Sequence, residues 1–107
     1  MTTFVILTSK PGQFHSEPGE GMRPVEAWDY VCEGRVRARF LVAELQAPGR
    51  VRVIDDTEPV TVNQVPTKFL ESFKDIDGAR RELHHLCAFG TVKAELRARH
   101  PAEFNAP

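Results

Sequence analysis

Arginine and aromatic side chains recur at every second position in the stretch 25–55, VEAWDYVCEGRVRARFLVAELQAPGRVRVID. A period of two is typical of a strand with one buried face. If Glu33-Gly34 forms a two-residue hairpin loop, Tyr30 lies opposite Arg37. The same parity predicts one shared sheet face, provided that no bulge shifts the register. That face would collect Trp28, Tyr30, Arg35, Arg37, Arg39, Arg50 and Arg52.

An open face of this composition has three chemical uses. Trp, Tyr and Arg dominate the energetic centres of protein interfaces, which favours docking on a protein partner that presents carboxylates, or on a second copy of the chain. Aromatic rings that stack bases beside arginines that hold phosphates would instead bind single-stranded nucleic acid. The third possibility is a solvated face on which the arginine stems cover the rings.

A second group of residues is titratable, and we treat His15, Asp29 and Tyr30 as candidate catalytic residues. By parity Asp29 falls on the apolar face of its strand, where a carboxylate needs a partner or a shifted pKa. His15 lies in a long segment, 9–24, rich in glycine and proline. A pocket between this segment and the sheet would make the protein a small enzyme or a ligand-binding protein.

The pattern predicts no metal site and no cofactor. Neighbouring residues on a helix point about 100° apart, so His84 and His85 cannot readily share one metal ion. The two cysteines, Cys32 and Cys87, are too few for a conventional iron–sulfur cluster. Neither a disulfide framework nor a Cys-x-x-Cys motif is present, which favours a reduced, cytoplasmic setting.

Several elements must position these residues. We expect a buried strand at 3–8, an irregular loop at 9–24, an antiparallel meander at 25–55 and a short edge strand at 60–62. Helices follow at 66–73, 77–88 and 92–99, the second capped by Asp75 or Asp77. The tail 101–107 is expected to be loose unless Phe104 docks.

These elements predict one α+β domain over residues 1–107. It would contain a four- to five-stranded, mostly antiparallel sheet with the C-terminal helices packed on one face. The formal net charge is −1, so a case for nucleic acid or an anionic membrane rests on the arginine face alone. Neither a signal peptide nor a membrane span is expected, because the longest apolar runs are short.

The start FVILTSKPGQF, with the strand VEAWDY, resembles in outline the short accessory proteins of bacterial oxygenase systems. No defined motif carries this resemblance, so it implies no residue roles. The sequence therefore predicts a non-catalytic binding module, an accessory subunit or adaptor in a multicomponent bacterial oxidoreductase or oxygenase. The alternatives are the pocket-containing protein and the single-stranded nucleic-acid binder.

Overall fold

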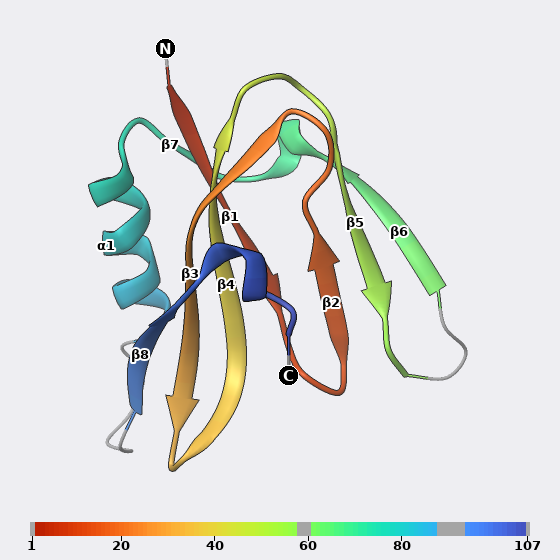
Figure 1. Cartoon of the computed structure of the whole chain (residues 1–107). Coiled ribbons are helices and arrows are strands. Elements are labelled where there is room, and N and C mark those ends of the chain that lie inside the picture. The colour runs from red at the N-terminus through yellow and green to blue at the C-terminus, as the bar shows by residue number, and fades with distance from the viewer. Residues whose placement is uncertain (1, 58–60, 88–93, 107) are drawn as a thin grey trace.

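Two antiparallel sheets and one α-helix make up the computed structural model of the chain, which describes residues 2–57, 61–87 and 94–106 (Figure 1). The predicted α+β class with a mostly antiparallel sheet is confirmed. Five strands form the larger sheet in the order β7-β1-β4-β3-β8, and three form the smaller sheet in the order β2-β5-β6. The strands of the larger sheet are β1 (Thr3–Ser9), β3 (Met22–Cys32), β4 (Arg35–Leu45), β7 (Ser72–Phe73) and β8 (Ala94–Arg99).

The smaller sheet corrects two expectations. Its strands are β2 (Phe14–Glu17), β5 (Arg50–Asp55) and β6 (Thr61–Pro66). Segment 9–24 is therefore not a wholly irregular loop, because it contains β2 and the start of β3. The three-stranded meander at 25–55 is also wrong in its last strand. Both edges of β4 are occupied by β1 and β3, so β5 pairs instead with β2 and β6.

The hairpin between β3 and β4 has the predicted two-residue loop. Glu33 and Gly34 both have positive φ, at 51° and 77°, as the turn that matches the strand twist requires. Next to the loop Cys32 faces Arg35 and Val31 faces Val36, but the following residue, Tyr30, faces Ala38. Arg37 is thus an extra residue on β4, a bulge that shifts the register by one residue until Val25, an extra residue on β3, restores it.

One α-helix, α1 (Ile76–Leu86), lies where the sequence predicts the middle helix. The carboxylate of Asp75 accepts a hydrogen bond from the backbone N–H of Gly78 at 2.7 Å, which confirms an aspartate N-cap. The two flanking helices were wrong. Residues 66–73 form a 3₁₀-turn at Thr67–Phe69 and then β7, while 94–99 form strand β8, and the rest of the predicted last helix lies outside the described residues.

The core has two parts, one on each face of the five-stranded sheet. On one face α1 covers Ala38, Phe40 and Val42 with its own Ala79 and Leu83. The other face packs against the smaller sheet and the C-terminal segment. Its buried residues are Val5, Leu7, Ala27, Leu41, Ala43, Val51 and Phe104.

The C-terminal segment is held in place by both apolar and polar contacts. Phe104 follows a 3₁₀-turn at Pro101–Glu103 and is only 4% exposed, so the exception foreseen for a loose tail applies. The Asn105 side chain accepts a hydrogen bond from Ser9 Oγ and donates one to the Ser16 carbonyl, each at 2.8 Å. We call Ser9, Ser16 and Asn105 the polar clasp. It holds the C-terminal segment against β1 and β2.

Candidate functional site

A cleft opens beside α1 because one helix cannot cover five strands. A helix with its side chains is about 10 Å across. Strands spaced about 4.8 Å apart make this sheet roughly 19 Å wide between its outer strands. The helix contacts β1, β4 and β7, so the helix-side face of β3 and β8 is left partly uncovered (Figure 1).

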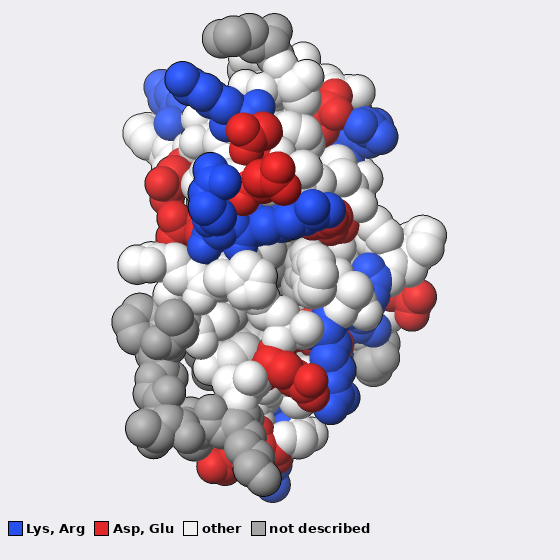
Figure 2. Space-filling view, turned by 90° about the vertical axis from the view of Figure 1, so that its left-hand side faces the viewer, with Lys and Arg blue, Asp and Glu red and all other residues white. Residues whose placement is uncertain are grey.

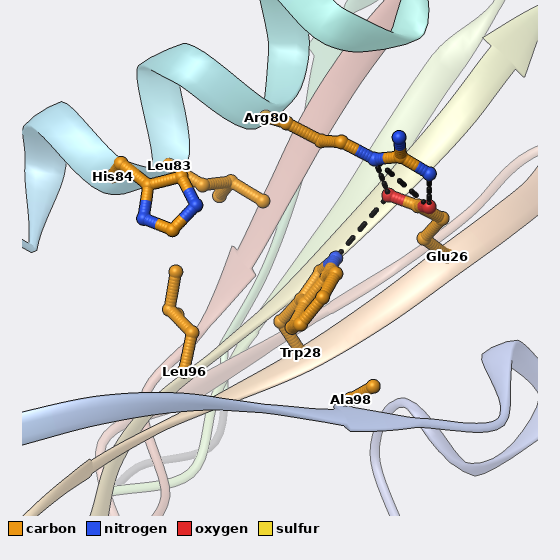
Figure 3. A pocket seen from close by; sticks show the side chains of 7 residues that line it. All are labelled: Glu26, Trp28, Arg80, Leu83, His84, Leu96 and Ala98. Atoms are coloured by element: carbon orange, nitrogen blue, oxygen red, sulfur yellow. Dashed lines mark hydrogen bonds and ion pairs between the residues drawn. The ribbon is translucent and has the colours of Figure 1, made fainter.

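The cleft has a volume of about 430 Å³ and mixes apolar walls with a polar end. Strands β3 and β8 form its floor, and α1 forms one wall (Figure 3). The lining residues are Glu26, Trp28, Arg80, Leu83, His84, Leu96 and Ala98. Their types match those of small-molecule sites, in which apolar and aromatic side chains surround a few placed polar groups.

The polar end is an ion pair that also fixes the orientation of the indole. Arg80 Nε lies 3.1 Å from each carboxylate oxygen of Glu26, and a second guanidinium nitrogen contacts Oε2. Trp28 Nε1 donates to Glu26 Oε1 at 3.3 Å. The Arg80 hydrogen bond lowers the pKa of Glu26 below its ordinary value of 4.5; partial burial opposes this, and the Trp28 hydrogen bond assists it. Glu26 is therefore ionised at neutral pH.

Trp28 occupies the middle of the cleft. Figure 3 shows its indole N–H directed toward Glu26, while the side chains of His84 and Leu96 lie on the other side of the cleft. The indole is half-buried and packs against the core under α1, so its orientation is restricted before any ligand arrives. An oriented aromatic face is a surface on which a flat ring can stack.

A second hollow adjoins the cleft along the helix. It has a volume of about 370 Å³ and shares His84 and Leu96 with the cleft. Tyr30 and Cys87 also line it. Burial raises the pKa of the Cys87 thiol above its ordinary value of 9.0, so this cysteine is a neutral thiol at physiological pH. Tyr30 and Trp28 thus lie on the helix side of the sheet, at neighbouring hollows.

The predicted shared face of arginines and aromatic residues is wrong. The bulge at Arg37 places Trp28 opposite Phe40 instead of Arg39, and both aromatic residues pack on the helix side. Arg35 and Arg37 are exposed near the hairpin loop. Arg50 and Arg52 belong to the other sheet, where Arg50 donates to Gln64 and Arg52 pairs with Glu17.

Asp29 and Arg39 instead form a charged cluster on the opposite face of the sheet. Arg39 Nε lies 3.6 Å from Asp29 Oδ1, and Arg99 Nη1 lies 3.4 Å from the same oxygen. The side chains of Asp29, Arg39 and Arg99 are 17, 13 and 15% exposed. Both arginines also donate to the carbonyl of Ala106. The parity argument thus correctly placed Asp29 on a largely buried face, and it finds its partners there.

His15 lies in a hollow of about 180 Å³ between segment 9–24 and the sheet, in the region where the second hypothesis expects a pocket. Its Nδ1 lies 2.8 Å from Asp56 Oδ2, and Arg39 lines the same hollow. His15 therefore shares this hollow with Arg39, which in turn pairs with Asp29. Tyr30 is on the other face of the sheet, so the three candidate catalytic residues do not form one site.

Sequence reasoning missed Glu26, Arg80 and Leu96 as lining residues. One signal was available, because Glu26, Trp28 and Tyr30 share the parity of one strand face. The pairing of Glu26 with Arg80 joins positions 54 residues apart and has no local signature. Leu96 was assigned to a helix.

Charge gives no support to a nucleic-acid surface on the helix side. Figure 2 shows this side of the molecule, on which acidic and basic side chains are interleaved instead of gathered into one basic patch. Within the described ranges, no three His, Cys, Asp or Glu side chains are grouped as a metal site would need. No helix in this part of the chain is both long and apolar enough to cross a membrane.

Comparison of the chain with protein-family models, with curated proteins and with solved structures finds no match.

Proposed function

We propose that this protein is a non-catalytic binding module whose ligand is a small organic molecule with a flat, apolar body. The observation that supports this most directly is Trp28, which is oriented by Glu26 and lines a cleft of about 430 Å³. Ligand sites of this kind measure roughly 300–1,000 Å³. The ring of the ligand would stack on the indole, between Leu83 on one side and Leu96 on the other.

The polar ends of the cleft define what the rest of the ligand carries. Arg80 is nearly half exposed, so it retains N–H groups that face solvent while Glu26 neutralises its charge. His84 offers a ring nitrogen at the other side. A ligand with hydrogen-bond acceptors at one end and an uncharged body fits this arrangement.

Trp28 is the only tryptophan in the chain, so its emission reports on the cleft directly. The probe is anilinonaphthalene sulfonate, an aromatic molecule with a flat naphthalene ring that accepts excitation energy from tryptophan. We expect saturable energy transfer from Trp28, and competition by ring-containing compounds that raise the melting temperature. His84→Ala should weaken binding about fivefold, equivalent to about 1 kcal/mol.

A matched control is the neighbouring histidine. His85 is exposed on the same helix and does not line the cleft, so His85→Ala should bind the probe as the unaltered protein does. Equal weakening by both substitutions, or energy transfer that does not saturate, would show that the probe only coats apolar surface.

Docking on a protein partner is a second candidate, favoured by the continuity of the two hollows at His84 and Leu96. Two adjoining hollows form a groove that suits an extended polypeptide, and Trp and Tyr are frequent anchors at interfaces. This is the accessory-subunit hypothesis, set in the cytoplasm within a multicomponent bacterial oxygenase. The free thiols of Cys32 and Cys87 support a reducing compartment.

The second candidate predicts a stoichiometric partner that co-purifies from cells that produce the protein naturally. Leu96→Asp should release that partner, while Leu86→Asp, at an already exposed position of α1, should retain it. Release by both substitutions, or by neither, would contradict docking in this groove. Nucleic-acid binding depended on the shared arginine face, and the dispersal of those arginines leaves it without support.

A further inference from the structure

Strand β8 forms one edge of the larger sheet. It pairs with β3 from Ala94 to Arg99, and no strand among the described residues lies on its other side. An edge strand presents a row of unpaired N–H and C=O groups, which is a template for another strand. The opposite edge, β7, has only two residues. β8 is therefore the longer of the two edges of this sheet.

We propose that β8 pairs with β8 of a second copy of this chain, antiparallel and about a twofold axis that passes beside Leu96. Antiparallel pairing of identical strands is self-complementary, as a twofold interface requires. Around this axis Glu95 of each copy faces Arg97 of the other, so the dimer gains two ion pairs between strands. Opposite charges across an antiparallel pair stabilise it.

The charges select this register. An axis perpendicular to the sheet keeps residues of the same face opposite each other, so the possible centres differ by whole residues. A centre at Glu95 would place this carboxylate against its own copy. A centre at Arg97 would place two guanidinium groups together, and a centre at Ala98 would oppose Arg97 to Arg99. Within the described strand, Ala94–Arg99, Leu96 is the one centre with substantial overlap and no like charges opposed.

The two charged residues are available for this role. Glu95 and Arg97 are 56 and 62% exposed and lie on the side of the sheet away from α1. Among the described residues they pair only with each other, with Arg97 Nη2 2.6 Å from Glu95 Oε1. In the dimer each carboxylate lies between two guanidinium groups, one from each copy.

The other side of the strand explains what the pairing would add. Leu96 and Ala98 line the cleft, and in the proposed register they face Leu96 and Ala94 of the second copy. The two α1 helices lie on the same face of a joined ten-stranded sheet. The second copy thus completes the open rim of each cleft with a leucine. The dimer proposal stands on β8 alone and does not depend on what the cleft binds.

Charge reversal tests both the dimer and its register. In Glu95→Arg, two arginines of one strand face two of the other, and in Arg97→Glu, carboxylates face carboxylates. Sedimentation equilibrium of the full-length chain should show a dimer for the unaltered protein and a monomer for each variant. Mixed in equal amounts, the two variants should form a heterodimer, because each supplies the charges that the other lacks.

A control and a fold check make each result decisive. Arg52→Glu reverses an exposed charge on the smaller sheet and should leave the dimer intact. The far-UV circular dichroism spectra of all variants should match that of the unaltered protein, which would show that each variant keeps the fold. The monomeric variants should melt at a somewhat lower temperature, because they lack the stabilisation that the dimer gives. A monomer at every concentration up to the solubility limit would overturn the proposal. So would a dimer that survives both reversals, or variants that stay monomeric when mixed.

Discussion

Asp29 lies opposite Arg39 across the β3–β4 hairpin, with Oδ1 and Nε 3.6 Å apart, on the face of the sheet away from α1. The extra residue Arg37 creates this relationship, because without the bulge Arg39 would face Trp28 on the helix side. One inserted residue on β4 therefore places the charged side chains and the aromatic side chains on opposite faces of the sheet. Charged groups gather near the C-terminal segment, and aromatic rings gather at the cleft.

Removal of Asp29 should destabilise the fold strongly. Asp29→Ala leaves Arg39 and Arg99 largely buried without their carboxylate, and breaking such a pair costs about 3 kcal/mol. Urea denaturation should show this loss in the free energy of unfolding. Glu17→Ala is the control, because the exposed pair with Arg52 contributes less than about 0.5 kcal/mol. An equal loss of unfolding free energy in both variants would show that the buried Asp29 cluster stabilises the fold no more than an exposed ion pair does.

Phe104 should contribute as a core residue. Phe104→Ala removes a ring that is 4% exposed between the sheets, and such truncations cost about 3–5 kcal/mol. Phe69→Ala makes the same chemical change at a ring that is 71% exposed, and should change the free energy of unfolding by less than about 0.5 kcal/mol. Thermal and urea denaturation compare the two. A stable Phe104→Ala variant would show that the C-terminal segment does not belong to the core.

Glu26 should make stability depend on acid pH. Because its pKa in the folded protein lies below the ordinary 4.5, the unfolded chain binds this proton more readily. The stabilisation is therefore fully present above pH 4.5 and disappears as the pH falls through the folded-state pKa. The difference in melting temperature between the unaltered protein and Glu26→Gln should be constant near neutral pH and shrink below pH 4.5. A difference that is independent of pH would contradict the ion pair with Arg80.

Cys87 should react slowly with alkylating reagents. The thiolate is the nucleophile, and burial raises the pKa of this thiol, so little thiolate exists near neutral pH. In Cys32→Ser, the only remaining thiol is Cys87, and mass spectrometry can follow its alkylation by iodoacetamide. The rate should be well below that of the same variant unfolded in urea, and should rise at a higher pH. Equal rates in the two states would show that Cys87 is not protected.

Local signals predicted the elements whose structure is decided locally. The Glu33-Gly34 loop requires positive φ at both positions, and the α1 cap requires a short acceptor side chain at Asp75. Gly34 and Asp75 meet these requirements, so the hairpin loop and the helix were predicted correctly, whereas the pairing beyond Val31 was not. The alternation of Trp28 and Tyr30 also correctly placed these two rings on one face of a strand.

The remaining elements were decided by distant partners. The bulge at Arg37 interrupts an unbroken alternation, so nothing in the neighbouring residues marks it. Residues 94–99, AELRAR, have high helix propensity, yet they form β8 because β3 offers a free edge and Asp29 offers a partner for Arg99. The same limit applies to the cleft, since Arg80 meets Glu26 only once α1 has packed.

The polar clasp joins residues 96 positions apart in the chain, Ser9 and Asn105. Closing a loop of that length is costly in entropy before any contact rewards it, and contacts of this kind slow folding. During folding, we therefore expect the hairpins to form first and the C-terminal segment to dock last. In the native state we expect the C-terminal segment to open before the hairpins. The backbone amides of Asn105 and its neighbours should therefore exchange with solvent faster than those of the paired strands β3 and β4. The segment that docks last during folding would then be the first to open in the native state.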